Sequence, residues 1–165
     1  MATLTAIHVV ISLAGIVSGF VVIFGLLGGK QLDRWTAFFL TTTVLTSVTG
    51  YFFPVHKLMP SHIVGALSLV ALGFAIFARY NRNLTGRWRA TYVVTAIVAQ
   101  YFNVFVLVVQ SFLKIPSLKA LAPTQSEPPF EIAQGLVLVL FVVLGTLAVK
   151  RFRVESAAVV AAASR

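Results

Sequence analysis

The chain has 165 residues, of which 59 % are hydrophobic and only 10 % are charged, and its mean hydropathy is +0.96. A typical soluble domain has roughly 45–50 % apolar and about 25 % charged residues, so the composition excludes such a domain and predicts a protein that uses lipid as its solvent. The net charge of +9 lies at the ends of apolar segments, which favours contact with lipid head groups and argues against nucleic acid. Without cysteine there can be no disulfide, thiolate metal site or thiol catalysis.

Long apolar segments predict an all-α fold, an integral membrane bundle of five transmembrane helices, at about residues 4–27, 35–53, 60–80, 90–113 and 130–149. Each segment approaches or exceeds the about 20 residues that cross a bilayer as a helix. The second is rich in Thr and Phe and would also suit a strand, but a lone strand cannot satisfy its backbone in lipid. We therefore expect one transmembrane domain over residues 1–153 and a frayed or disordered tail at 154–165.

The first span has no charge and no basic segment before it, so we interpret it as a retained helix and not as a cleaved signal. His8, Ser12, Gly15 and Gly19 recur at spacings of four, three and four, which places them on one stripe of the helix. We expect Gly15 and Gly19 to let a second helix approach closely.

A short link of sequence YFFPVHKLMPSH joins the second and third spans and contains His56, Met59 and His62. After it, Gly65 and Ser68 form a second stripe of small residues suited to close helix contact. Because a chain this small has two such stripes to cover, we expect a homo-oligomer or a larger membrane complex.

The fourth span carries three amides, Gln100, Asn103 and Gln110, on one side of the helix. Large amides facing lipid would be costly, so they should point into the bundle or into a water-filled path. Two interpretations stay open: a hydrogen-bonded contact between helices and the lining of a pore or carrier.

Residues 114–129 form the longest connector, with four prolines, and its IPSLKALA portion suits a short amphipathic turn at the interface. Glu131 follows in the first turn of the fifth span, where a carboxylate complements the helix dipole.

The distribution of Lys and Arg predicts the orientation. One set of connectors holds ten of these residues and the other holds three, Lys57, Lys114 and Lys119. By the positive-inside rule the N-terminus and the histidine link should be outside and the C-terminus cytoplasmic.

This orientation places His8, His56 and His62 in one layer near the outer face. Neutral imidazole is the commonest protein ligand for metals and also binds haem iron, and a nearby thioether would suit copper. We therefore expect His8 and His62 to hold a cofactor, either haem or copper or zinc, with His56 as a further ligand and Met59 or Glu131 as the fourth. The opposing interpretation is that these are ordinary interfacial histidines, whose amphipathic rings suit head-group depth.

Residues 88–130, especially YFNVFVLVVQSFLKIP and LAPTQSEPPF, resemble a group of small uncharacterised bacterial inner-membrane proteins. The resemblance implies a multi-pass protein of the bacterial inner (cytoplasmic) membrane and carries no known activity or catalytic residue.

Three functions remain open from the sequence. The first is a metal- or haem-binding protein for electron transfer or metal handling, the second a pore or carrier using the amide face, and the third an accessory subunit without chemistry. No nucleophile, base and acid are linked by spacing, and no phosphate-binding loop is present, so no catalytic residue is assigned. The acids lie only at the ends of spans, which argues against ordinary proton-coupled transport.

Overall fold

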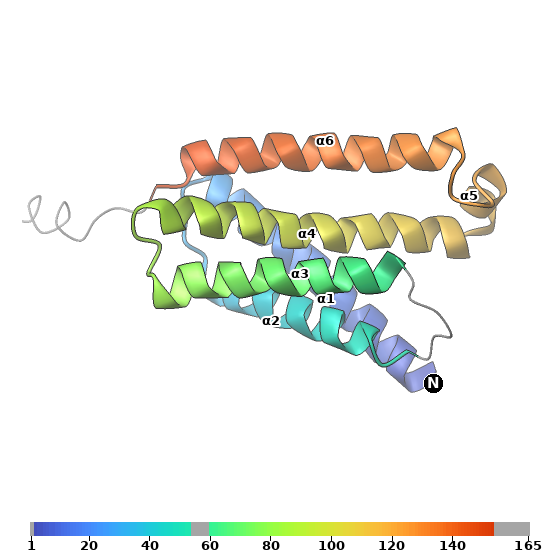
Figure 1. The fold of residues 1–165 in the computed structure, drawn as a ribbon, viewed down its shortest axis with the longest axis horizontal. Helices are drawn as coiled ribbons and strands as arrows, with labels where there is room; N and C mark the ends of the chain where they lie inside the picture. Colours follow the sequence, from blue (N-terminus) through green and yellow to red (C-terminus); the bar gives the residue numbers. More distant parts are fainter. Residues whose placement is uncertain (1, 54–59, 154–165) are drawn as a thin grey trace, which may run out of the picture.

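The computed structural model describes residues 2–53 and 60–153, and within these ranges the chain is helical with no strand (Figure 1). The elements are α1 Ala2–Leu27, α2 Asp33–Gly50, α3 Pro60–Ile76, a π-helical turn Phe77–Asn81, α4 Arg87–Lys114, α5 Pro116–Leu121 and α6 Pro128–Arg151. The all-helical prediction is confirmed. His56, Met59, Lys57 and the expected tail at 154–165 lie outside the described residues.

Within residues 2–53 and 60–153, four helical segments are long and apolar enough to cross a membrane: Thr3–Leu27, His62–Asn81, Arg87–Lys114 and Pro128–Arg151. The second predicted span is helical as well, but α2 is not among these four. It has 18 residues, begins with Asp33 and Arg34, and carries hydroxyl residues throughout. Its hydroxyls, such as Thr42 and Thr49, donate to carbonyls one turn earlier, at 2.8 and 2.7 Å, which lowers the cost of placing them in an apolar medium.

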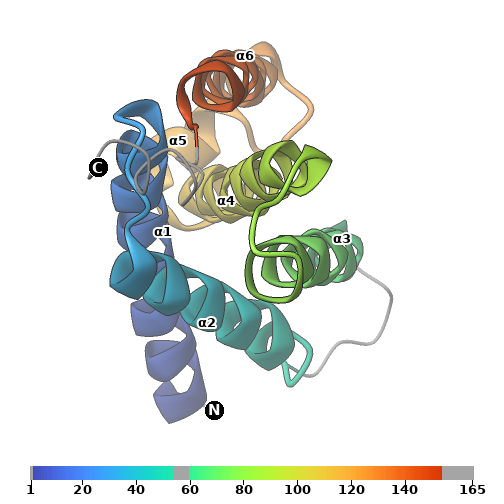
Figure 2. The same cartoon turned by 90° about the vertical axis from the view of Figure 1, so that its left-hand side faces the viewer.

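The helices run side by side as a bundle, and α4 occupies its centre (Figure 2). Helix α4 packs against α3 on one side, against α6 on another, and against α1 and α2 on a third. Helix α1 crosses the bundle at an angle (Figure 1), so its first half contacts α2 and its second half reaches α4 and α6.

The core lies toward the end of the bundle where α1 ends and α4 begins. Its largest fully buried side chains include Tyr92, Phe39, Leu72 and Ile23. Phe152, just after α6, packs its ring 6.3 Å from Tyr92. Phe152 therefore joins the end of α6 to the core.

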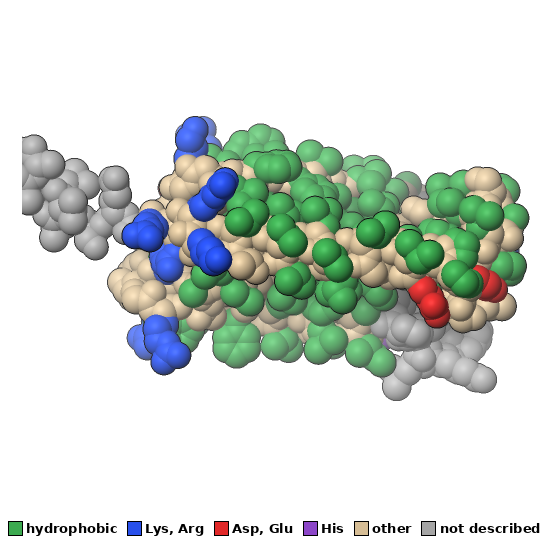
Figure 3. Space-filling view, turned by 90° about the horizontal axis from the view of Figure 1, so that it is seen from above, with side chains coloured by type: hydrophobic (Ala, Val, Ile, Leu, Met, Phe, Trp, Pro, Cys, Tyr) green, Lys and Arg blue, Asp and Glu red, His purple; other side chains and the backbone are tan. Residues whose placement is uncertain are grey.

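Most Lys and Arg side chains lie at one end of the bundle, and Glu127 and Glu131 lie at the other (Figure 3), whereas Asp33 lies among the basic residues and pairs with Arg79. The loops and helix ends where α1 ends and α4 begins hold nine of the described Lys and Arg residues, and the opposite end holds Lys114 and Lys119. We call these the basic end and the histidine end, because His8 and His62 lie near the helix ends opposite the basic one.

Candidate functional site

At the histidine end, His8 contacts the last turn of α2. Its Nδ1 lies 2.8 Å from Oγ1 of Thr49, and its ring meets the edge of Phe53 with centroids 5.1 Å apart. Gly50 lies beside the ring, where a Cβ would be 3.8 Å from Cε1 of His8. The sequence places Thr49 on a polar face of α2, but nothing in its spacing connects it with His8, 41 residues away.

His62 contacts the same end of α2 through Tyr51. The Tyr51 hydroxyl donates to the backbone carbonyl of His62 at 2.7 Å, and the two rings have centroids 5.4 Å apart. One turn later, a Cβ at Gly65 would lie 3.3 Å from the Tyr51 hydroxyl, so the glycine makes room for this ring. Tyr51 is therefore the residue that positions the start of α3, and sequence reasoning missed it.

Glu131, the remaining expected ligand among the described residues, is not brought to these two histidines. Glu131 is exposed in the first turn of α6, and that turn lies across the bundle from the start of α1 (Figures 1 and 2). Among residues 2–53 and 60–153, no group of three or more His, Asp or Glu side chains is close enough to hold a metal. The described part of the chain thus supplies two histidines near one helix end.

The amides of α4 do not share one environment. Gln100 is fully buried; its Nε2 donates to the Ile16 carbonyl of α1 at 2.7 Å, and its Oε1 accepts from Asn103 Nδ2 at 3.3 Å. Asn103 also donates to Thr43 Oγ1 on α2 at 3.1 Å. Gln110, by contrast, is exposed. The network joins α1, α2 and α4, and it uses both ends of the Gln100 amide.

Both stripes of small residues lie inside the chain. Gly19 faces Gln100 so closely that a Cβ would overlap the amide, and a Cβ at Gly15 would lie 3.4 Å from Thr42 and Thr43. Ser68 accepts a hydrogen bond from the Ser47 hydroxyl of α2 at 3.4 Å. Because the chain covers these stripes itself, they do not require a second copy.

At the basic end, three arginines hold helix ends together. Arg79, only 7 % exposed, forms an ion pair with Asp33 at the start of α2 and lies 5.1 Å from the Tyr92 ring centroid. Arg82 lies 5.0 Å from the Trp88 ring, and Arg89 donates to the carbonyls of Val149 and Phe152. The sequence identified these residues only as a charge cluster that sets orientation.

Comparisons with protein-family models, with curated proteins and with solved structures gave no match. Composition and fold therefore define the class on their own: a helical bundle with four helices capable of crossing a membrane and a hydrogen-bonded polar seam in its interior.

Proposed function

We propose that the chain is a multi-pass protein of the bacterial inner membrane in which α2 forms a fifth span, with the N-terminus outside and the C-terminus cytoplasmic. Three features support this. Helix α2 lies between α1 and α3 (Figure 2), its 18 residues extend about 27 Å, and the basic residues gather at one end (Figure 3), as the positive-inside rule requires of the cytoplasmic side.

We further propose that His8 and His62 bind a metal ion or haem near the outer face, for electron transfer or metal handling. One observation carries this: both histidines contact the C-terminal end of α2, His8 at Thr49 in its last turn and His62 at Tyr51, the residue that follows the helix. Two imidazoles at one helix end supply two ligands of a metal site, and the proposal takes the remaining ligands from outside the described residues.

The hydrogen bond of His8 also determines which of its ring nitrogens is available to bind a metal. The Thr49 hydroxyl lies 2.7 Å from the Leu45 carbonyl and donates its hydrogen there, so Thr49 Oγ1 accepts from His8 Nδ1–H. In the neutral ring this leaves the lone pair on Nε2, the arrangement in which a second-shell partner orients a metal-binding histidine. Thr49 would thus be the positioning residue of the site.

The donor set fits copper, zinc or haem iron, all of which accept neutral imidazole. Within the link 54–59, His56 and Met59 are the side chains that could complete it: a thioether would favour copper, and a further imidazole would suit zinc. A bound ion would supply Lewis acidity or a redox couple.

Elemental analysis of the detergent-purified protein for iron, copper and zinc tests this proposal. We expect near-stoichiometric metal that is lost in His8→Ala and in His62→Ala and retained in Gln110→Ala, which removes an exposed polar side chain. Thr49→Val should weaken metal retention about 10–100-fold, the usual cost of losing a second-shell partner. Metal-free protein from metal-replete cells would contradict the site and would favour the accessory-subunit interpretation.

A further inference from the structure

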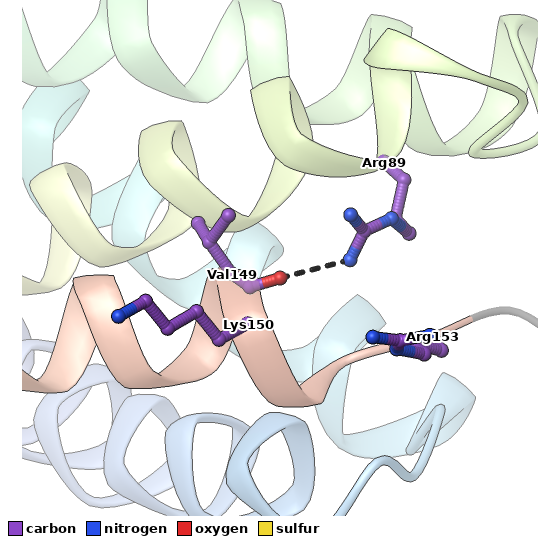
Figure 4. A pocket seen from close by; sticks show the side chains of 4 residues that line it. All are labelled: Arg89, Val149, Lys150 and Arg153. Atoms are coloured by element: carbon purple, nitrogen blue, oxygen red, sulfur yellow. Dashed lines mark hydrogen bonds between the residues drawn. The ribbon is translucent and has the colours of Figure 1, made fainter.

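The basic end contains an open hollow of about 640 Å³ between α4 and the end of α6, lined by Arg89, Val149, Lys150 and Arg153 (Figure 4). One nitrogen of Arg89, Nη1, donates to the carbonyls of Val149 and Phe152. A guanidinium has five N–H donors in all, so the others are available to a ligand. Lys150 and Arg153 are exposed. Three cationic residues thus line one hollow, with the flexible Lys150 side chain extended away from Arg89 (Figure 4).

These cations have no carboxylate partner within residues 2–53 and 60–153. Asp33 is paired with Arg79, and Glu127 and Glu131 belong to the opposite end of the bundle (Figure 3). An uncompensated cluster of Arg and Lys favours an anion, and a phosphate group matches both the planar guanidinium and the ammonium.

A second, apolar groove of about 250 Å³ lies between the same two helices. Its walls include Val94, Ile97 and Tyr101 of α4 and Leu138, Val142 and Gly145 of α6. Val94, Leu138 and Val142 are 48 %, 49 % and 60 % exposed, so the groove is open along its length to the surroundings of the bundle.

The two hollows follow one another along the α4–α6 pair. On α6, Leu138, Val142, Gly145 and Val149 recur at spacings of three and four, which is one stripe of a helix, and Val149 lines the basic hollow. On α4, Val94 to Tyr101 follow Arg89 over the next 12 residues, about 8 to 18 Å along the axis. The cationic hollow and the apolar groove therefore adjoin each other.

We propose that this surface is a binding site for an anionic phospholipid, with its phosphate at Arg89, Lys150 and Arg153 and one acyl chain in the groove between α4 and α6. Basic hollows between membrane helices on the cytoplasmic side are suited to such head groups. A soluble phosphate would use the cations but would gain nothing from the groove, so the pairing of the two hollows favours the lipid.

Native mass spectrometry of the full chain in non-ionic detergent, offered equal amounts of phosphatidylglycerol and phosphatidylcholine, tests this site. We expect phosphatidylglycerol to be retained preferentially. Lys150→Gln with Arg153→Gln should reduce that retention about 25-fold, or about fivefold for each cation. Lys30→Gln with Arg34→Gln removes two exposed cations at the same end, outside the hollow, and should change retention less than twofold.

Gly145→Leu tests the groove without changing charge, since the added side chain would occupy it; Gly135→Leu, where a Cβ meets nothing within 4 Å, is its control. We expect about tenfold lower lipid retention in the first and no change in the second. Equal losses in the two double charge variants, unchanged retention in Gly145→Leu, or displacement of the lipid by equimolar glycerol phosphate would each overturn the assignment. Circular dichroism of every variant confirms that it folds.

Discussion

Helix α4 makes two kinds of contact, a hydrogen-bonded seam with α1 and α2 and a contact with α6 that leaves a groove. Toward α1 and α2 it meets small residues, and its amides Gln100 and Asn103 bond to those helices. Toward α6 it meets branched side chains and leaves an open groove. Of an apolar 18-residue stretch in each helix, 39 % is buried inside the bundle in α1, against 11 % in α6.

The difference shows how membrane helices make either a closed or an open contact. Lipid is as apolar as leucine, so helix association depends on close packing and hydrogen bonds. Gly19 and Gln100 provide both on the α1 side. On the α6 side the hydrogen bonds lie toward the two ends of α6, from Arg89 to Val149 and from Gln134 to Phe105; between them Val94 and Val142 leave a groove open.

The largest expected effect is on the closed seam. Gly19→Leu should destabilise the protein by about 2–3 kcal/mol, because a side chain there overlaps the buried Gln100 amide. Thermal unfolding in detergent, followed by circular dichroism, measures this against Gly135→Leu, which adds the same side chain on the open part of α6. Equal melting temperatures for the two variants would show that the seam is not tightly packed.

Removing the amide itself should have a smaller effect. Gln100→Leu loses the hydrogen bonds to Ile16 and Asn103 and should cost about 1–2 kcal/mol. Gln110→Leu, at an exposed position of the same helix, should cost less than about 0.5 kcal/mol. The same unfolding assay compares them, and a larger loss at Gln110 would contradict the described seam.

In the contact with α6, adding a side chain at a glycine should raise the stability instead of lowering it. Gly145→Ala adds a Cβ 3.6 Å from Ile97, an ordinary contact distance, and removes a glycine from a helix interior. We expect a gain of about 0.5–1 kcal/mol, whereas Gly19→Ala should lower stability. Opposite shifts in melting temperature for these two substitutions would be the sharpest evidence that α4 has two kinds of neighbour; shifts of the same sign would remove the distinction.

The smallest effect concerns the loop before α6. Partial desolvation acts to raise the pKa of Glu127, but hydrogen bonds from the Thr124 hydroxyl and from the Thr124 and Ser126 backbone outweigh it and hold the pKa below its ordinary 4.5. The stabilisation that these hydrogen bonds give the folded loop is therefore complete above pH 4.5, and it is lost as the pH falls through the lowered, folded-state pKa of Glu127. The NMR amide shifts of Thr124 and Ser126 should move in that range. Glu131→Gln should preserve the change and Glu127→Gln should abolish it.

Much of the fold could be predicted because lipid imposes a simple condition on the chain. Apolar runs of about 20 residues must be helical, and the observed ends of α4 and α6 lie within about three residues of those expected from the sequence. Helix α2 is the exception: its helical state was predicted, but its polar content leaves it outside the four candidate spans.

The candidate sites could be predicted only in part, because each depends on residues far apart in the chain. Spacing placed Gln100 and Gln110 on one side of α4, yet only Gln100 lies where α1 crosses, and so only Gln100 is buried. Similarly, spacing along α1 could not indicate that His8 would meet Thr49.

The sequence by itself determined the class of the molecule, its helices and the separation of its charges, since hydropathy and charge act locally and through the bilayer. Only the tertiary structure decided which helices are neighbours. It brings His8 and His62 to the C-terminal end of α2, and it places Arg89, from the first turn of α4, against a carbonyl in the last turn of α6. The physical reason is that helix order around a bundle depends on the joint packing of all its faces, which no single segment encodes.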